Sequence, residues 1–166
     1  MKGKVTTLIA VAATFAIALV STACGSTAYS SGRYGAPVAT STRVAAATVG
    51  VRQTSLGPVI VDSKGRTLYL FEKDTSRRSA CSGQCAQFWP PLLTHGAPVA
   101  RAGAKQSLLG RIKRADGSRQ VTYAGHPLYL YVGDTKPGQT NGEGSHEFGA
   151  GWDVLAPSGK KIEGDG

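Results

Sequence analysis

Two stretches of the chain match each other and decide the fold: TLYLFEKDT at residues 67–75 and PLYLYVGDT at residues 127–135. Both read Leu-Tyr-Leu-aromatic-x-x-Asp-Thr. The spacing from Tyr69 to Tyr129 is nearly the same as the spacing from Trp89 to Trp152, so the match extends beyond the two stretches. Self-similarity of this kind indicates a duplicated supersecondary unit that buries its apolar face against its copy.

The residues around both stretches favour β-strands. Short apolar runs flank turn-forming segments at residues 62–65, 115–118 and 156–159, each of which contains glycine. After the first 23 residues no long 3.6-residue apolar period exists, and only Gln84–Phe88 is expected to form a helical turn. The predicted fold is all-β or β-dominated, with about six to eight short strands. In it, two copies of a hairpin-plus-aromatic-strand repeat pack as one small domain.

The N-terminus has the pattern of an export signal. Lys2 and Lys4 precede an uncharged apolar run that ends in Ser-Thr-Ala directly before Cys24. This pattern predicts a lipoprotein signal peptide over residues 1–23 and lipidation of Cys24. The same residues also fit an ordinary signal cleavage that leaves a free thiol, or an uncleaved membrane anchor. The chain has three cysteines, and lipidation of one leaves the other two as a pair, which favours the lipoprotein interpretation.

Composition divides the rest of the chain. Residues 24–48 are rich in Ser, Thr, Ala and Gly and are predicted to be a flexible tether. Residues 49–162 are the predicted duplicated β domain, and residues 163–166 are a short tail. The formal net charge is +9, but the basic residues are scattered, without a long basic run, so nucleic acid is not an expected partner. Such a charge is expected to form a solvated basic surface, and the alternative outside the cell is attraction to anionic lipid headgroups or cell-wall polymers.

The repeated pattern resembles the predicted bacterial lipoproteins that carry a repeated Tyr-x-(Phe/Trp/Tyr)-x-x-Asp motif, a family of secreted repeats of unknown function. The two copies of the motif are YLFEKD at residues 69–74 and YLYVGD at residues 129–134. Flanking features that also fit lie at residues 62–68, 81–85, 89–91, 115–117 and 125–128. The resemblance implies an exported location and a repeat architecture, and it implies no particular biochemical activity.

The aromatic residues of the motif are the first candidate site. Side chains alternate along a strand, so Tyr69 and Phe71 should face away from the leucines beside them, and the same holds for Tyr129 and Tyr131. We expect these rings in the core, because a small domain needs the large areas that aromatic rings bury. An aromatic surface that stacks on sugar rings or on a planar cofactor is the alternative.

The aspartates of the motif are the second candidate. Asp74 and Asp134 each end an aromatic strand and precede a threonine. An aspartate in this place commonly accepts backbone N–H groups and opens the following loop, which is the expected role. A cation site is the alternative, and it would need further oxygen ligands nearby.

The remaining two cysteines, Cys81 and Cys85, have the spacing C-x-x-x-C. In an exported domain this pair is expected to form a disulfide. The alternative is a redox or metal pair to which histidines add ligands. The candidate metal-binding histidines are His95, His126 and His146.

No G-x-S-x-G, H-E-x-x-H, P-loop or G-x-G-x-x-G motif occurs in the chain. We therefore expect a non-enzymatic binding or structural module without a cofactor, anchored by lipid to the cell membrane and facing the extracellular or periplasmic side. Its expected partner is the membrane, through the N-terminal lipid, with an anionic cell-wall polymer or an envelope protein as further candidates. The alternative is an envelope protein that handles electrons, copper or haem through Cys81, Cys85 and the histidines.

Overall fold

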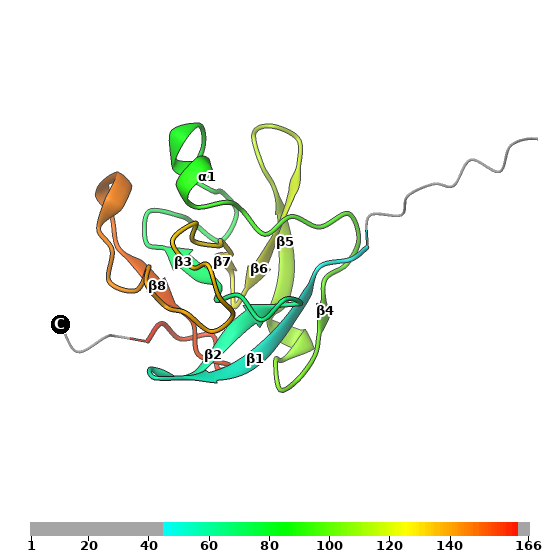
Figure 1. The fold of residues 1–166 in the computed structure, drawn as a ribbon. Helices are drawn as coiled ribbons and strands as arrows, with labels where there is room; N and C mark the ends of the chain where they lie inside the picture. The colour runs from blue at the N-terminus through cyan, green and yellow to red at the C-terminus, as the bar shows by residue number, and fades with distance from the viewer. Residues whose placement is uncertain (1–44, 163–166) are drawn as a thin grey trace, which may run out of the picture. The chain divides into compact units, whose positions relative to one another are not determined.

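The structure of this chain, a computed structural model, describes residues 45–162. The predicted signal peptide (1–23), Cys24, the predicted tether as far as residue 44 and the tail (163–166) lie outside the described residues. Within residues 45–162 no helix is long and apolar enough to cross a membrane. The same part of the chain holds eight short strands and one five-residue α-helix, which confirms the predicted β-dominated fold (Figure 1).

Each repeat begins with an antiparallel hairpin. In the first repeat, β1 (Thr48–Thr54) pairs with β2 (Gly57–Asp62). In the second repeat, β5 (Leu109–Lys113) pairs with β6 (Arg119–Tyr123) across the Asp-Gly turn found in the sequence. Strand β1 starts one residue before the expected domain boundary at residue 49.

Four shorter strands complete three small sheets. The first sheet has the order β2-β1-β4, in which β4 (Val99–Ala100) runs parallel to β1. The second joins β3 (Tyr69–Phe71), the first aromatic strand, to β8 (Trp152–Val154) in antiparallel register. The third has the order β5-β6-β7, and β7 (His126–Pro127) leads into the second aromatic segment.

Three helical turns connect the strands. Helix α1 covers Gln84–Phe88, where the sequence predicts a helical turn, and two 3-10 turns cover Gln106–Leu108 and Glu147–Gly149. The second 3-10 turn holds Phe148 at φ 62°, a left-handed conformation that bulky residues rarely adopt.

The two repeats meet along their aromatic segments. The Tyr69 N–H donates to the Tyr129 carbonyl at 2.9 Å, and the Tyr129 N–H donates to the Tyr69 carbonyl at 3.0 Å. The two residues thus exchange both backbone hydrogen bonds, as directly opposed residues of an antiparallel pair do. This pairing relates the two copies by an approximate two-fold axis.

The final segment of each repeat pairs with the hairpin of the other repeat. The Ile60 N–H in β2 donates to the Leu155 carbonyl at 2.9 Å. At the equivalent place in β6, the Val121 N–H donates to the Leu92 carbonyl at 2.9 Å. The two acceptors are equivalent, because each follows the tryptophan of its own repeat at the same spacing. Each repeat therefore completes the sheet of the other.

The aromatic strands lie between two apolar clusters. Tyr69 and Phe71 belong to the first cluster, which we call the aromatic cluster and which also contains Trp89, Tyr129, Trp152, Val59, Val61, Val154, Cys81 and Cys85. Leu68 and Leu70 belong to the second cluster, together with Ile60, Val121 and Leu128 among others. Neighbouring residues of the strand thus face opposite clusters, as the sequence pattern predicts.

Candidate functional site

Four aromatic rings form a continuous stack through the aromatic cluster. Trp89 and Trp152 lie at its centre with ring centroids 3.9 Å apart and planes 8° from parallel. Phe71 stacks on Trp152 at 4.1 Å, and Tyr131 stacks on Trp89 at 4.3 Å. Each repeat therefore places its strand ring on the tryptophan of the other repeat.

Two further rings close the edges of the stack. Tyr69 meets Trp89 edge-on at 5.3 Å, and Tyr129 meets Trp152 edge-on at 5.2 Å. Both tyrosines and both tryptophans are fully buried, and only Tyr131 of the stacked rings is half-buried. Edge-to-face and offset-stacked pairs of this kind add about 0.5–1.5 kcal/mol each beyond the area they bury. These rings thus pack against each other in the core.

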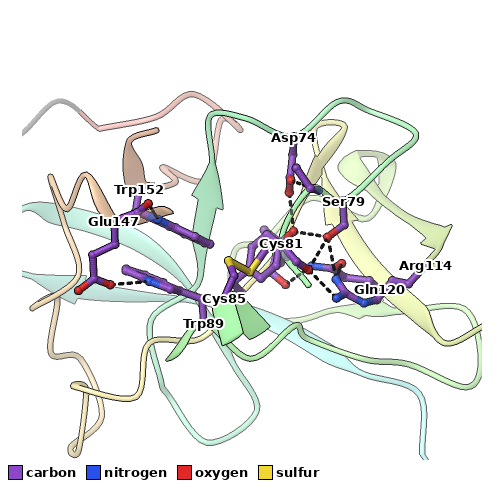
Figure 2. The surroundings of a disulfide bond; sticks show 12 residues. Asp74, Ser79, Cys81, Cys85, Trp89, Arg114, Gln120, Glu147 and Trp152 are labelled. Atoms are coloured by element: carbon purple, nitrogen blue, oxygen red, sulfur yellow. Dashed lines mark hydrogen bonds between the residues drawn. A yellow bond between two sulfur atoms is a disulfide. The ribbon is translucent and has the colours of Figure 1, made fainter. Parts of the chain in front are cut away.

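One residue accepts hydrogen bonds from both tryptophans. The Trp89 Nε1–H donates to the Glu147 carboxylate at 2.9 Å, and the Trp152 Nε1–H donates to the Glu147 backbone carbonyl at 2.9 Å (Figure 2). A buried indole N–H needs an acceptor, so Glu147 satisfies the polar atoms at the centre of the stack.

The tyrosine of each repeat donates its hydroxyl proton to the aspartate of the other repeat. The Tyr69 hydroxyl lies 2.6 Å from Asp134 Oδ2, and the Tyr129 hydroxyl lies 2.6 Å from Asp74 Oδ2. The motif tyrosine and the motif aspartate are therefore hydrogen-bond partners between the two copies, across the two-fold axis, and not within one copy. Short hydrogen bonds to a carboxylate are about twice as strong as neutral ones.

The second oxygen of each aspartate holds the loop that follows it. Asp74 Oδ1 accepts the Ala80 N–H at 2.7 Å, and Asp134 Oδ1 accepts the Asn141 N–H at 3.0 Å. Each aspartate thus ties a loop of its own repeat to a tyrosine of the other. In the part of the chain that the structure describes, no group of three or more His, Cys, Asp or Glu side chains could hold a metal ion.

Burial controls the proton affinity of these four groups. It raises the pKa of Tyr69 and of Tyr129 well above the ordinary value of 10.0, and the hydrogen bond to the aspartate raises it further. Burial also raises the pKa of Asp74 and of Asp134 above 3.8, although the tyrosine hydroxyl that each accepts acts in the opposite direction. Both tyrosines therefore stay protonated as donors throughout the physiological range.

Cys81 and Cys85 are joined by a disulfide at one side of the aromatic cluster (Figure 2). The Cys81 carbonyl accepts a hydrogen bond at 2.7 Å from Arg114 Nη2. Arg114 Nη1 donates to Ser79 Oγ at 2.8 Å and to Gln120 Oε1 at 2.6 Å. One buried arginine therefore connects the disulfide loop of the first repeat to β6 of the second.

An open pocket of about 650 Å³ lies beside this arginine. Its walls come from the segment around the disulfide, residues 78–83 with Ala86, and from the turn between β5 and β6, residues 113–116. Among the described residues, the cationic side chains in its lining are Arg78, Lys113 and Arg114, and the only acidic one is Asp116.

The three histidines lie on the surface, and all three are exposed. His126 lines a pocket of about 500 Å³ that Asp74 also borders, whereas His95 lines a different pocket of about 360 Å³. Neither pocket includes Cys81 or Cys85, and within residues 45–162 the histidines and the cysteine pair form no group of three or more potential metal ligands.

Sequence reasoning did not single out Arg114. A usable signal exists: Ile112 and Arg114 are two residues apart in a hairpin, so they face the same side, and the apolar Ile112 marks that side as buried. In the structure both residues are buried. Glu147 carries no comparable signal, because no local sequence pattern marks it as an acceptor for two indole N–H groups.

The fold and this site define a two-repeat β protein in which the repeated residues form the contact between the repeats. The chain belongs to the family described as a secreted repeat of unknown function, whose model matches residues 50–93 and 110–156. The two matched segments run from the first hairpin strand to just beyond the tryptophan of each repeat. No curated protein and no solved structure matches the chain. Membership in a family of secreted repeats indicates an extracellular or cell-envelope location.

Proposed function

We propose that the protein is a lipid-anchored component of the cell envelope whose duplicated β domain is a non-enzymatic binding module. Acyl chains on Cys24 would hold it at the outer face of the cytoplasmic membrane, and the segment between Cys24 and β1 would act as a tether. The basic Lys2 and Lys4, the apolar run and Ser-Thr-Ala before Cys24 support the anchor, and the secreted-repeat family supports the location.

The observation that carries the proposal is that the motif residues of each repeat form hydrogen bonds to the motif residues of the other repeat. The hydroxyls of Tyr69 and Tyr129 and the carboxylates of Asp74 and Asp134 bind one another across the repeats. The repeated polar groups are thereby engaged in holding the domain together, and the rings beside them are buried. A rigid scaffold of this kind suits a module that binds through its surface rather than one that performs chemistry at its motif.

A redox role is the second candidate, and one observation favours it. Cys81 lines the open pocket beside Arg114, but the residue is fully buried, so a small reductant would reach the Cys81–Cys85 disulfide from that side only when this segment opens. Reduction by an external dithiol would give two thiols and leave the dithiol as its own disulfide. This role predicts that the bond is cycled in the envelope, whereas the binding module requires it to stay oxidised.

The anchor is tested by metabolic labelling of the full chain with a fatty-acid analogue. Wild-type protein should incorporate the label and sediment with membranes, and Cys24→Ser should lose both properties, because stable anchoring needs more than one acyl chain. The matched control is the Cys81→Ser/Cys85→Ser double variant, which should keep the label. Label that persists in Cys24→Ser would contradict the proposal.

A further inference from the structure

Arg114 is a buried cation whose hydrogen-bond acceptors within the described residues are all neutral. Its side chain is 5% exposed. The guanidinium donates to the hydroxyl of Ser79, the amide oxygen of Gln120 and the backbone carbonyl of Cys81. None of these acceptors carries a charge, so the desolvated positive charge of Arg114 is not neutralised by the groups that hold it.

One edge of the guanidinium is incompletely used. An arginine has five N–H donors, and the three hydrogen bonds named above leave the Nε–H and one Nη2–H. Nε is buried and makes no hydrogen bond within residues 45–162. The edge formed by Nε and Nη2 is one that binds a carboxylate or phosphate with two parallel hydrogen bonds.

The carboxylates near Arg114 do not fill that edge. Asp116 Oδ2 lies 3.7 Å from Nε, which is too far for a hydrogen bond, and its side chain is 63% exposed. Arg114 is connected to Asp74 only indirectly, through hydrogen bonds of the Ser79 and Tyr129 hydroxyls. Asp116 is therefore a weak and displaceable counterion at the mouth of the site.

The pocket beside this edge has a positive lining. Arg78 and Lys113 border the 650 Å³ space together with Arg114, and both are exposed. Neither forms an ion pair with a carboxylate within the described residues. Among the described residues, three cations thus face Asp116 as the single acidic group of the lining, while the hydroxyl of Ser82 supplies a further hydrogen-bonding group.

We propose that this pocket is a binding site for the phosphate group of an organic phosphate, which displaces Asp116 from the Nε edge of Arg114. A phosphate matches the site better than a carboxylate does, because its larger negative charge suits three cations. Two of its oxygens can bind the Nε–Nη2 edge of Arg114 while the others face the charges of Arg78 and Lys113. The site lies between the repeats, because Lys113, Arg114 and Asp116 come from the second hairpin whereas Arg78 and the disulfide segment come from the first repeat.

This inference rests on the proposed function, since it names the ligand class of the envelope binding module. The same chemistry could come from a phosphorylated envelope polymer or from an anionic lipid headgroup. Glycerol 3-phosphate is a probe for the shared chemistry, and phosphatidylglycerol added to the micelle is a probe for the headgroup.

The test uses the full-length, membrane-extracted chain in non-ionic detergent, with glycerol 3-phosphate followed by backbone-amide NMR shifts at low salt. Shifts should concentrate at residues 78–86 and 113–116, and glycerol should cause none. Arg78→Ala/Lys113→Ala should weaken binding about five- to tenfold, since each exposed charge contributes up to about 1 kcal/mol and about 1.4 kcal/mol is tenfold. Asp116→Asn, which keeps an oxygen to cap the turn, should instead strengthen binding roughly threefold, because it removes the competing charge.

The matched control is Lys105→Ala/Lys136→Ala, which removes two exposed charges that do not line the pocket. Equal loss of affinity in this control and in Arg78→Ala/Lys113→Ala would overturn the site and leave only a general charge effect. No shifts at all, or weaker binding by Asp116→Asn, would also overturn it. Competition by phosphatidylglycerol supports the site with a headgroup as source, and binding without such competition supports it with a soluble or polymeric phosphate. Lipid labelling of Cys24 is independent of all these outcomes, so a failed site leaves the proposed anchor standing.

Discussion

The exchange of hydrogen bonds between repeats makes a quantitative prediction for Tyr69→Phe. The substitution keeps the ring against Trp89 and removes only the hydroxyl, which lies 2.6 Å from Asp134 Oδ2. Asp134 is 8% exposed, so its oxygen would lose its donor with little access to water. A hydrogen bond to a charged group is worth about 1.5–3 kcal/mol, and an unsatisfied buried polar group costs about 1–3 kcal/mol. We therefore expect Tyr69→Phe to lower the free energy of unfolding by about 2–3 kcal/mol.

A double-mutant cycle identifies the aspartate that accepts the hydrogen bond of the Tyr69 hydroxyl. Urea unfolding followed by tryptophan fluorescence and circular dichroism should give a coupling energy of about 1–3 kcal/mol between Tyr69→Phe and Asp134→Ala. The control cycle pairs Tyr69→Phe with Asp74→Ala, the aspartate of the same motif copy, with which Tyr69 shares no hydrogen bond. Those two effects should add within about 0.5 kcal/mol. A larger coupling to Asp74 than to Asp134 would refute the exchange.

Three more predictions follow from the core, the disulfide and the buried carboxyls. Tyr69→Ala, or the same change in the second repeat, should destabilise the domain by about 3–5 kcal/mol, the range for large buried aromatics, and unchanged urea midpoints would contradict a core role. Replacing Cys81 and Cys85 by serine should cost about 2 kcal/mol on the chain-entropy estimate for so short a loop, and two freely alkylated thiols in fresh unreduced protein would show that no disulfide forms. Because burial raises the pKa of Asp74 and Asp134 above 3.8, the folded state binds more protons than the unfolded state just above that pH. The contribution of the two carboxyls to the free energy of unfolding is thus full below pH 3.8 and is lost as pH rises through their folded pKa values. Urea titrations at a series of pH values should show that Asp74→Asn/Asp134→Asn removes this part of the pH dependence.

Much of the fold could be predicted because its determinants are local or repeated. The matching spacing of the tyrosines and the tryptophans identified the two repeats, and alternation along the strand assigned tyrosines and leucines to opposite faces. The Asp-Gly turn predicted the β5–β6 hairpin, and the two prolines after Trp89 predicted the end of the helical turn that is α1. The β1–β2 hairpin escaped prediction, since its two-residue connection, Ser55-Leu56, is not one of the glycine-containing pairs typical of such turns.

The candidate site was less predictable because its contacts join distant parts of the chain. The sequence indicated that Asp74 and Asp134 hold loops, but the tyrosine that each accepts comes from the other repeat, 55 and 65 residues away. These hydrogen bonds depend on the antiparallel backbone pairing of Tyr69 with Tyr129, which no local sequence pattern specifies. Arg114 was treated as one of many scattered cations, because burial of a charge depends on partners that only the folded chain brings together.

The central claim is that each repeat completes the other, and separating the repeats tests it most directly. The exposed connection at Ala102-Gly103 allows one fragment to end at Gly103 and the other to begin at Ala104. Neither fragment alone should show a cooperative unfolding transition, because each lacks the strand that pairs with its hairpin and the tryptophan that stacks on its aromatic ring. Mixed in equal amounts, they should associate one to one and regain the fluorescence and circular dichroism of the intact chain. A single fragment that unfolds cooperatively by itself, or a mixture that stays unfolded, would contradict the account.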